Sequence, residues 1–238
     1  MGAAGVLLAS ILALQPAAAV PITFFGEDTA AGGALPIPNS AAAQASFLSQ
    51  LIGVSVESFE GIAVGTQFPM NLTFGPDTAT LTGTNTVSST GVQNSGLLGR
   101  FATSGSNYLN VGSSDAASFT LTFSSPQAAF GFFATDIGDV SGQLAIELGG
   151  VPVVVPHTVN APNGSALFFG VIDVASPFTT VRFTNTTGTL GDAFGFDQMT
   201  IGRRDNVANP PTAVPDGGAS ITMLAIGLLG LAARRLWP

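Results

Sequence analysis

Hydroxyl-bearing and apolar residues alternate without exception in Ser118-Phe119-Thr120-Leu121-Thr122-Phe123. Successive side chains of a β-strand point to opposite faces, so this pattern predicts a strand with one apolar face and one hydroxylated face. The same period of two recurs in residues 143–148 and 180–184. These segments therefore predict half-buried strands of antiparallel sheet.

Two further segments, residues 128–135 and 166–171, are almost continuously apolar. Such runs are typical of strands that are covered on both faces. Clusters of turn-forming residues, such as 103–107 and 160–164, separate the runs, and we count about ten strands on this basis. The pattern predicts an all-β fold, a two-sheet antiparallel β-sandwich of jelly-roll-like form, over residues 54–202.

One short helix is predicted in residues 20–53, the segment before the sandwich. Asn39 or Ser40 is a suitable N-cap, and Gly53 is a suitable end. The residues at helical spacing, which we expect to form the buried stripe, are Phe47, Leu48, Leu51 and Ile52. After the sandwich, residues 203–213 contain two adjacent prolines and few apolar residues, which predicts a linker.

Composition excludes several classes of function. The 238 residues include no cysteine, no lysine, one histidine and six arginines, and the formal charge is −8. Nothing in such a chain neutralises several phosphates, so a nucleic-acid partner is excluded. Zinc-thiolate sites, disulfides and thiol nucleophiles are excluded as well. The 18 phenylalanines argue against a disordered chain, because disorder requires low hydrophobicity.

The N-terminal end predicts a signal peptide over residues 1–19. Gly2 to Leu14 is almost wholly apolar, and Ala17-Ala18-Ala19 then supplies an A-x-A cleavage site before Val20. The segment lacks the basic residues that usually begin a signal peptide. A buried N-terminal helix is the alternative.

The C-terminal end, residues 214–238, predicts a second targeting segment. Val214-Pro215-Asp216-Gly217-Gly218 interrupts the chain, and a fifteen-residue run without charge follows, ending at Ala233. Arg234 and Arg235 come next. A stable spanning helix needs ~20 apolar residues, so this hydrophobic transmembrane helix is expected to hold the chain in the inner membrane only temporarily. The arginines would stay cytoplasmic, leaving residues 20–214 outside, and a plain membrane anchor is the alternative.

The C-terminal segment contains the V-P-D-G-G motif, then a short apolar helix, then an arginine pair. This order resembles the PEP-CTERM sorting signals of Gram-negative bacteria, in their V-P-D-S-G variant. Gly217 stands where that variant has serine. The resemblance implies exosortase as a partner, processing near Pro215–Gly217, and export to the cell surface or to an extracellular exopolysaccharide matrix.

The region between the two ends has a resemblance of its own. Residues 57–75, 129–136 and 194–197 resemble ectodomains that are often found ahead of such sorting signals. The opening and closing strands are also similar to those of jelly-roll carbohydrate-binding modules, which implies a sandwich with a carbohydrate ligand.

Catalytic chemistry finds little support. His157 is the only imidazole, no Gly-x-Ser-x-Gly elbow accompanies it, and we expect an exposed loop histidine. Paired carboxylates cleave glycosides in other proteins, but sugar clefts usually present aromatic rings. Between the two targeting segments this chain has no tryptophan and only Tyr108. We therefore expect no enzyme.

Three carboxylates share strand parity with apolar neighbours, namely Glu60, Asp136 and Asp197. A buried carboxylate is costly unless it is paired or bound to a cation, and arginine is scarce here. We therefore predict a structural calcium site of Glu60 and Asp197 near the first and last strands, a position that often holds calcium in the jelly-roll modules that the chain resembles. Asp136 and Asp139 either bind a second ion or cap a turn. The alternative is that these acids reach water at strand ends.

Two functions remain. The first is a secreted or cell-surface, non-enzymatic β-sandwich protein, processed by exosortase, with a structural or adhesive role in the extracellular matrix. The second is a calcium-stabilised carbohydrate-binding module. The scarcity of Trp and Tyr weakens the second reading, because sugar rings stack on such side chains.

Overall fold

The computed structural model describes residues 20–83, 91–94, 96, 98–112, 118–139, 143–186 and 193–208. The predicted signal peptide, sorting motif, hydrophobic helix and arginine pair lie outside the described residues. Val20–Pro210 form one compact unit. Within the described ranges no helix is long and apolar enough to cross a membrane.

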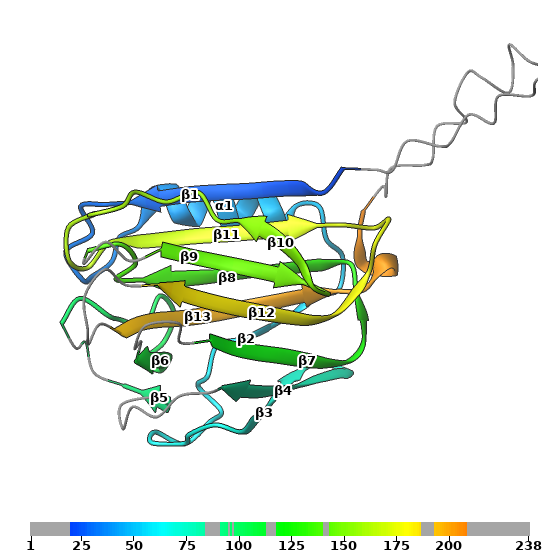
Figure 1. Cartoon of the computed structure of the whole chain (residues 1–238), viewed down its shortest axis with the longest axis horizontal. Coiled ribbons are helices and arrows are strands. Elements are labelled where there is room, and N and C mark those ends of the chain that lie inside the picture. The colour runs from blue at the N-terminus through cyan, green and yellow to red at the C-terminus, as the bar shows by residue number, and fades with distance from the viewer. Residues whose placement is uncertain are drawn as a thin grey trace, which may run out of the picture. The chain divides into compact units, whose positions relative to one another are not determined.

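Two antiparallel sheets form this unit, which confirms the predicted all-β sandwich (Figure 1). The seven-stranded sheet contains, in spatial order, β1 (Ile22–Asp28), β11 (Ala166–Ile172), β8 (Ala129–Thr135), β13 (Ala193–Gly202), β6 (Tyr108–Gly112) and β5 (Gly91–Gln93), with β2 (Ser55–Glu57) on β13. The six-stranded sheet contains β10 (Val151–Val154), β9 (Gln143–Leu148), β12 (Phe178–Thr186), β7 (Ser118–Gln127), β4 (Asp77–Gly83) and β3 (Met70–Phe74). The chain crosses between the sheets at several connections, β7 to β8 and β12 to β13 among them.

The described residues contain thirteen strands, where the sequence pattern predicted about ten. Much of the excess is short: β2 and β5 have three residues each and β10 has four. A segment of this length hardly completes one period of alternation, so its pattern carries little signal. In the longer strands the prediction is confirmed, since β7 buries Phe119, Leu121 and Phe123 and turns the residues between them outward.

The predicted helix is present as α1 (Pro38–Leu48), and it covers one face of the seven-stranded sheet (Figure 1). Phe47 on α1 is fully buried above Gly131 of β8 and Gly170 of β11, which are paired in register. A Cβ atom at either glycine would lie 2.7 Å from the ring of Phe47. Glycine is therefore required at both positions, and α1 explains why β8 and β11 are buried along their whole length.

Two details of the helix prediction are wrong. The helix ends at Leu48, and Ile52 is 64% exposed, because the chain turns at residues 49–53 toward β2. The N-cap is also supplied differently: Asp28 of β1 accepts hydrogen bonds from the backbone N–H groups of Asn39 (3.1 Å) and Ser40 (2.8 Å). A carboxylate from a neighbouring strand thus replaces the expected local cap.

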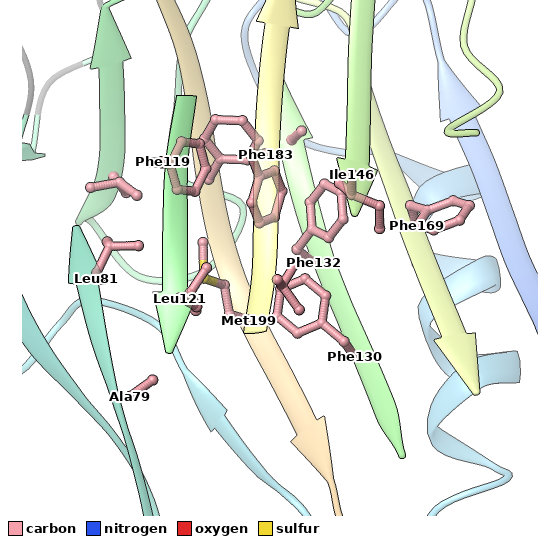
Figure 2. Close-up of a cluster of buried hydrophobic side chains, with 14 of the residues drawn as sticks. Ala79, Leu81, Phe119, Leu121, Phe130, Phe132, Ile146, Phe169, Phe183 and Met199 are labelled. Atoms are coloured by element: carbon pink, nitrogen blue, oxygen red, sulfur yellow. The ribbon is translucent and has the colours of Figure 1, made fainter. Parts of the chain in front are cut away.

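Aromatic rings fill the space between the sheets. Figure 2 shows Phe119, Phe183, Phe132 and Phe130 in this core. Phe183 stacks on Phe119 with ring centroids 4.3 Å apart, and it meets Phe132 edge-on at 4.9 Å. The first part of the predicted linker, residues 203–208, packs on the sandwich through η1 (Arg204–Asn206) and the buried Val207.

Candidate functional site

The middle of β13 is irregular, and this irregularity places Asp197. The pairing of β13 with β8 shifts register between Asp197 and Thr200, and Gln198 has a φ of +46°. A bulge of this kind redirects side chains. Asp197 is 1% exposed, as the predicted apolar orientation requires.

Four hydrogen bonds satisfy the Asp197 carboxylate. Its Oδ2 accepts from the Thr103 N–H (2.8 Å), the Thr103 hydroxyl (3.0 Å) and the Ser104 N–H (3.0 Å), and its Oδ1 accepts from the Gln198 N–H (2.6 Å). Burial raises the pKa of Asp197 to about 7, although these hydrogen bonds act in the opposite direction. The cost of burying the charge therefore outweighs the stabilisation that the donors supply.

Glu60 holds the other end of the same loop. Its Oε1 accepts hydrogen bonds from the backbone N–H groups of Ser106 (2.7 Å) and Asn107 (2.6 Å). Residues 103–107, which we name the anchored loop, are thus fixed by Asp197 at one end and Glu60 at the other. The predicted pair does converge, but on backbone donors of this loop.

The expected orientation of Glu60 is wrong. Glu60 is exposed, because β2 ends at Glu57 and the strand parity used in the prediction does not extend to residue 60. The predicted calcium ion itself stays a prediction. Within the described ranges, no group of three or more His, Asp and Glu side chains is arranged to hold a metal ion.

Asp136 is fully buried at the end of β8, as predicted. Its Oδ1 accepts a hydrogen bond from the Gly164 N–H at 2.9 Å, and its Oδ2 lies 3.7 Å from Nη1 of Arg100. Burial, helped by the charge of Asp139, raises the pKa of Asp136 to about 6, although the Gly164 hydrogen bond and the charge of Arg100 act in the opposite direction. Among the described residues, the positive charge beside Asp136 is the Arg100 guanidinium, and Asp136 joins the loop of Gly164 to the sheet.

His157 is half-buried, which corrects the expected exposed histidine. Its Nε2 accepts a hydrogen bond from the backbone N–H of Leu144 at 3.0 Å. The bond joins the segment after β10 to the start of β9. This nitrogen is therefore engaged in holding the fold.

The outer face of strands β3, β4, β7, β12 and β9 forms a surface rich in hydroxyl and amide groups, which we name the hydroxylated face. It consists of Asn71, Thr73, Thr78, Thr80, Thr82, Thr120, Thr122, Ser124, Gln143, Ala145, Glu147, Thr180, Arg182 and Thr184. Register aligns these residues in rows across the strands. Asn71, Thr80, Thr122 and Thr180 form one row across four strands.

The only charges on the hydroxylated face neutralise each other. Arg182 of β12 lies opposite Glu147 of β9, and the side chains form an ion pair at 3.4 Å. A second row runs from Thr82 through Thr120 to this pair. The face is therefore polar without net charge.

A hollow of about 450 Å³ adjoins the hydroxylated face at the β9–β10 end. Its walls include the apolar side chains of Pro152 and Val154 and the polar groups of Gln143 and Thr184. The hollow is thus amphipathic. The sequence analysis identified the outward hydroxyl residues of single strands, but neither the rows nor the hollow, because both depend on which strands are neighbours.

No protein-family model and no curated protein matches this chain. Among solved structures, it is similar to the K2 cleaved adhesin domain of Lys-gingipain, at 17% identity and a TM-score of 0.42, over 63% of this chain and 97% of that chain. It is also similar to TmCBM61 in complex with β-1,4-galactotriose, at 17% identity and a TM-score of 0.32, over 62% of this chain and 94% of that chain. A mutant of CBM29-2, from the family 29 carbohydrate-binding modules, is similar at 12% identity and a TM-score of 0.34, over 66% of this chain and 97% of that chain. At such low TM-scores these likenesses support no inference about the ligand of this chain.

Proposed function

We propose that this chain is an exported, non-enzymatic β-sandwich protein that contacts neutral polysaccharide in an extracellular matrix. The observation that carries the proposal is the hydroxylated face, a sheet surface of aligned hydroxyl and amide groups without net charge. Hydroxyl groups both donate and accept hydrogen bonds, as sugar hydroxyls do. A neutral glycan therefore meets a matching set of partners along each row.

The hollow beside β10 complements this surface. The C–H face of a sugar ring is apolar and packs on side chains such as Pro152 and Val154, while Gln143 and Thr184 offer polar partners to its hydroxyls. Among the described residues that form the hydroxylated face there is no aromatic ring. Without such a ring, binding at one site is weak, and several copies must act together to hold a polymer. This favours an adhesive or structural role over that of a high-affinity module.

The two residues that could act as a catalytic base, His157 and Asp197, are both occupied in the fold. Nε2 of His157 accepts a backbone N–H, and Asp197 accepts four hydrogen bonds. The lone pair of this His157 nitrogen is therefore occupied, and Asp197, which is 1% exposed, is out of reach of a substrate.

The export route rests on the sequence. Residues 1–19 and 214–238 support delivery by a signal peptide, transient holding in the inner membrane, and processing by exosortase. The intact mass of the protein from cells tests this route, because it reports both cleavage positions. Full-length protein that stays in the inner membrane with its C-terminus intact would count against it.

Calcium remains part of the proposal through Glu60 and Asp197. Calorimetric titration of Val20–Pro210 with calcium tests whether the ion binds. Heat of binding and a higher Tm would support the ion site, and their absence at millimolar calcium would reject it.

Affinity electrophoresis in gels that contain neutral glucans, galactans or mannans tests the ligand. We expect retardation of Val20–Pro210 by at least one neutral polymer. Thr80→Val and Thr122→Val together remove two hydroxyls of one row while keeping shape and strand preference, so retardation should fall severalfold. Thr23→Val, at an exposed position of β1, is the matched control. No retardation by any polymer, or equal retardation of the double variant, would refute the proposal.

A further inference from the structure

A second hollow, which we name the end pocket, lies between the two sheets where β13 leads into η1 (Figure 1). Ser55 of β2 and Ile201 of β13, which are paired in register, come from one sheet, and Phe74 of β3 and Gln127 of β7 come from the other. Its volume of about 230 Å³ is below the ~300–1,000 Å³ of pockets for drug-sized ligands, so it suits one small ring. The end pocket shares no residue with the hydroxylated face or with the hollow beside β10.

Gln127 is fully buried in the wall of the end pocket, and its amide has a defined orientation. Nε2 donates hydrogen bonds to the backbone carbonyl oxygen and to Oγ of Ser125, both at 3.0 Å. Turning the amide over would place Oε1 against the Ser125 carbonyl oxygen. Oε1 accepts no hydrogen bond within the described ranges. Because a buried acceptor without a partner costs free energy, a ligand that donates to Oε1 would remove this cost.

Arg203 supplies donors to the same pocket. Its Nε donates a hydrogen bond to Oδ2 of Asp77 at 2.8 Å, and its Nη2 donates to Oδ1 of the same carboxylate. The remaining nitrogen, Nη1, makes no hydrogen bond in the part of the chain that the structure describes, and the side chain is 47% exposed. Asp77 therefore holds the guanidinium in place and leaves the N–H groups of Nη1 to a ligand.

The charges around the end pocket balance one another. Asp77 forms an ion pair with Arg203, and exposed Asp205 directly follows exposed Arg204 in η1. An anionic ligand would approach two carboxylates, and a cationic ligand would approach the guanidinium of Arg203. A neutral ligand avoids both repulsions and is therefore favoured.

The polar atoms require a ligand that both donates and accepts hydrogen bonds. Oε1 of Gln127 needs a donor, and Nη1 of Arg203 needs an acceptor. A hydroxyl group has both capacities, so two adjacent hydroxyls on one ring satisfy the two atoms. The apolar side chains of Val54, Phe74 and Ile201 also line the pocket and suit the C–H groups of such a ring.

We propose that the end pocket binds a single neutral sugar residue through two adjacent hydroxyl groups, one donating to Oε1 of Gln127 and one accepting from Nη1 of Arg203. The choice of a sugar as the source of these hydroxyls rests on the proposed polysaccharide ligand. Since the pocket has room for one ring, it holds the end or a side branch of a polymer, whereas the hydroxylated face lies along the polymer.

An NMR titration of the backbone amides of Val20–Pro210 tests the proposal. This unit contains both hydrophobic clusters and all described strands. The probes are the methyl glycosides of glucose, galactose and mannose, vicinal cyclohexanediol, and cyclohexanol, which offers the ring with one hydroxyl. A ligand of this size binds with a Kd of about 1–10 mM, so each probe is added to about 100 mM. We expect at least one glycoside to shift amides within residues 74–77 and 201–206, and the diol to shift them more than cyclohexanol does.

Two substitutions test the two polar contacts separately. Gln127→Met keeps the length of the side chain and removes the acceptor, so the Kd of the glycoside should rise about tenfold. Arg203→Lys keeps a positive partner for Asp77 and removes Nη1, so the Kd should rise severalfold. Arg204→Lys is the matched control, because it makes the same change at an exposed neighbour outside the pocket wall, and it should leave the Kd unchanged. Circular dichroism shows which variants are folded, and Arg203→Lys remains a test if Gln127→Met does not fold.

Three results would overturn the proposal. The first is the absence of shifts at the end pocket with every glycoside at about 100 mM. The second is an equal response to cyclohexanol and to the diol, which would indicate an unspecific apolar contact. The third is an unchanged Kd in a folded Gln127→Met or Arg203→Lys variant. Failure of the polysaccharide proposal gives a different result, namely no gel retardation by any polymer while glycosides still shift the amides of the end pocket.

Discussion

Removal of the Phe183 ring is the most demanding test of the sandwich core. Phe183 is fully buried on β12 and contacts rings from both sheets (Figure 2). It stacks on Phe119 at 4.3 Å with an interplanar angle of 9°, and it meets Phe132 at 4.9 Å and Phe196 at 5.3 Å edge-on. It also meets Phe130 edge-on at 5.9 Å, so Phe183→Ala removes a stacked pair and three edge-on pairs at once.

The expected loss follows from these contacts. Truncation of a buried phenylalanine to alanine costs about 3–5 kcal/mol, because the lost transfer free energy and the cavity add together. Four favourable ring pairs place this site at the upper end, near 5 kcal/mol, because each is worth about 0.5–1.5 kcal/mol beyond its buried area. In a domain of this size, about 2–4 °C of Tm is lost for each kcal/mol, so Tm should fall by about 10–20 °C.

Urea unfolding followed by circular dichroism, with calorimetry for Tm, measures the loss in Val20–Pro210. Phe25→Ala is the control, because Phe25 is partly exposed at the sheet edge and should lose about 1 kcal/mol or less. A double-mutant cycle of Phe119→Leu and Phe183→Leu should show a coupling of about 1 kcal/mol. A loss below about 2 kcal/mol for Phe183→Ala would refute the reasoning, since it would mean that the rings do not share one packed core.

Three further predictions concern carboxylates. Burial raises the pKa of Asp136 and Asp197 above the ordinary value of 3.8, so each binds its proton more tightly in the folded chain. The free energy of unfolding should therefore rise as pH falls from about 8 to about 5, and Asp197→Asn should flatten this dependence in urea titrations. Asp28→Ala removes the acceptor at the start of α1 and should cost about 1–2 kcal/mol in chemical unfolding, whereas Asp28→Asn should cost less. The hydrogen bond from Arg203 holds the pKa of Asp77 below its ordinary value of 3.8. The pair therefore stabilises the fold at pH values above 3.8, and this stabilisation is lost as pH falls through the pKa of Asp77 in the folded chain. Acid unfolding of Arg203→Ala should begin at higher pH than that of the parent chain, and an unchanged midpoint would contradict this role.

Strand identity was predictable where a segment was long enough to show its period. Residues 118–123 and 143–148 showed in the sequence which side chains would be buried. The three-residue strands β2 and β5 show no such period, and their pairing partners stabilise them. The length of α1 was overestimated for a related reason, because Ile52 has helical spacing but lies beyond the helix, where the chain turns.

For the carboxylates, too, the sequence predicted burial but not the hydrogen-bond partners. Burial of Asp136 and Asp197 follows from parity along one strand, and both are buried. Parity did not reveal their partners, because Thr103 is 94 residues from Asp197 and Gly164 is 28 residues from Asp136. Only the folded chain brings these donors within hydrogen-bond reach.

Local order along the chain was enough to establish the all-β class, the one helix and the set of outward hydroxyl residues, because a period of two or 3.6 residues belongs to one segment alone. Other features depend on strand order and register: the rows of the hydroxylated face, the anchored loop, and the position of Phe47 above two paired glycines. Those are properties of contacts between segments far apart in the chain, since the energy that selects among pairings comes from packing and hydrogen bonds across the whole sandwich.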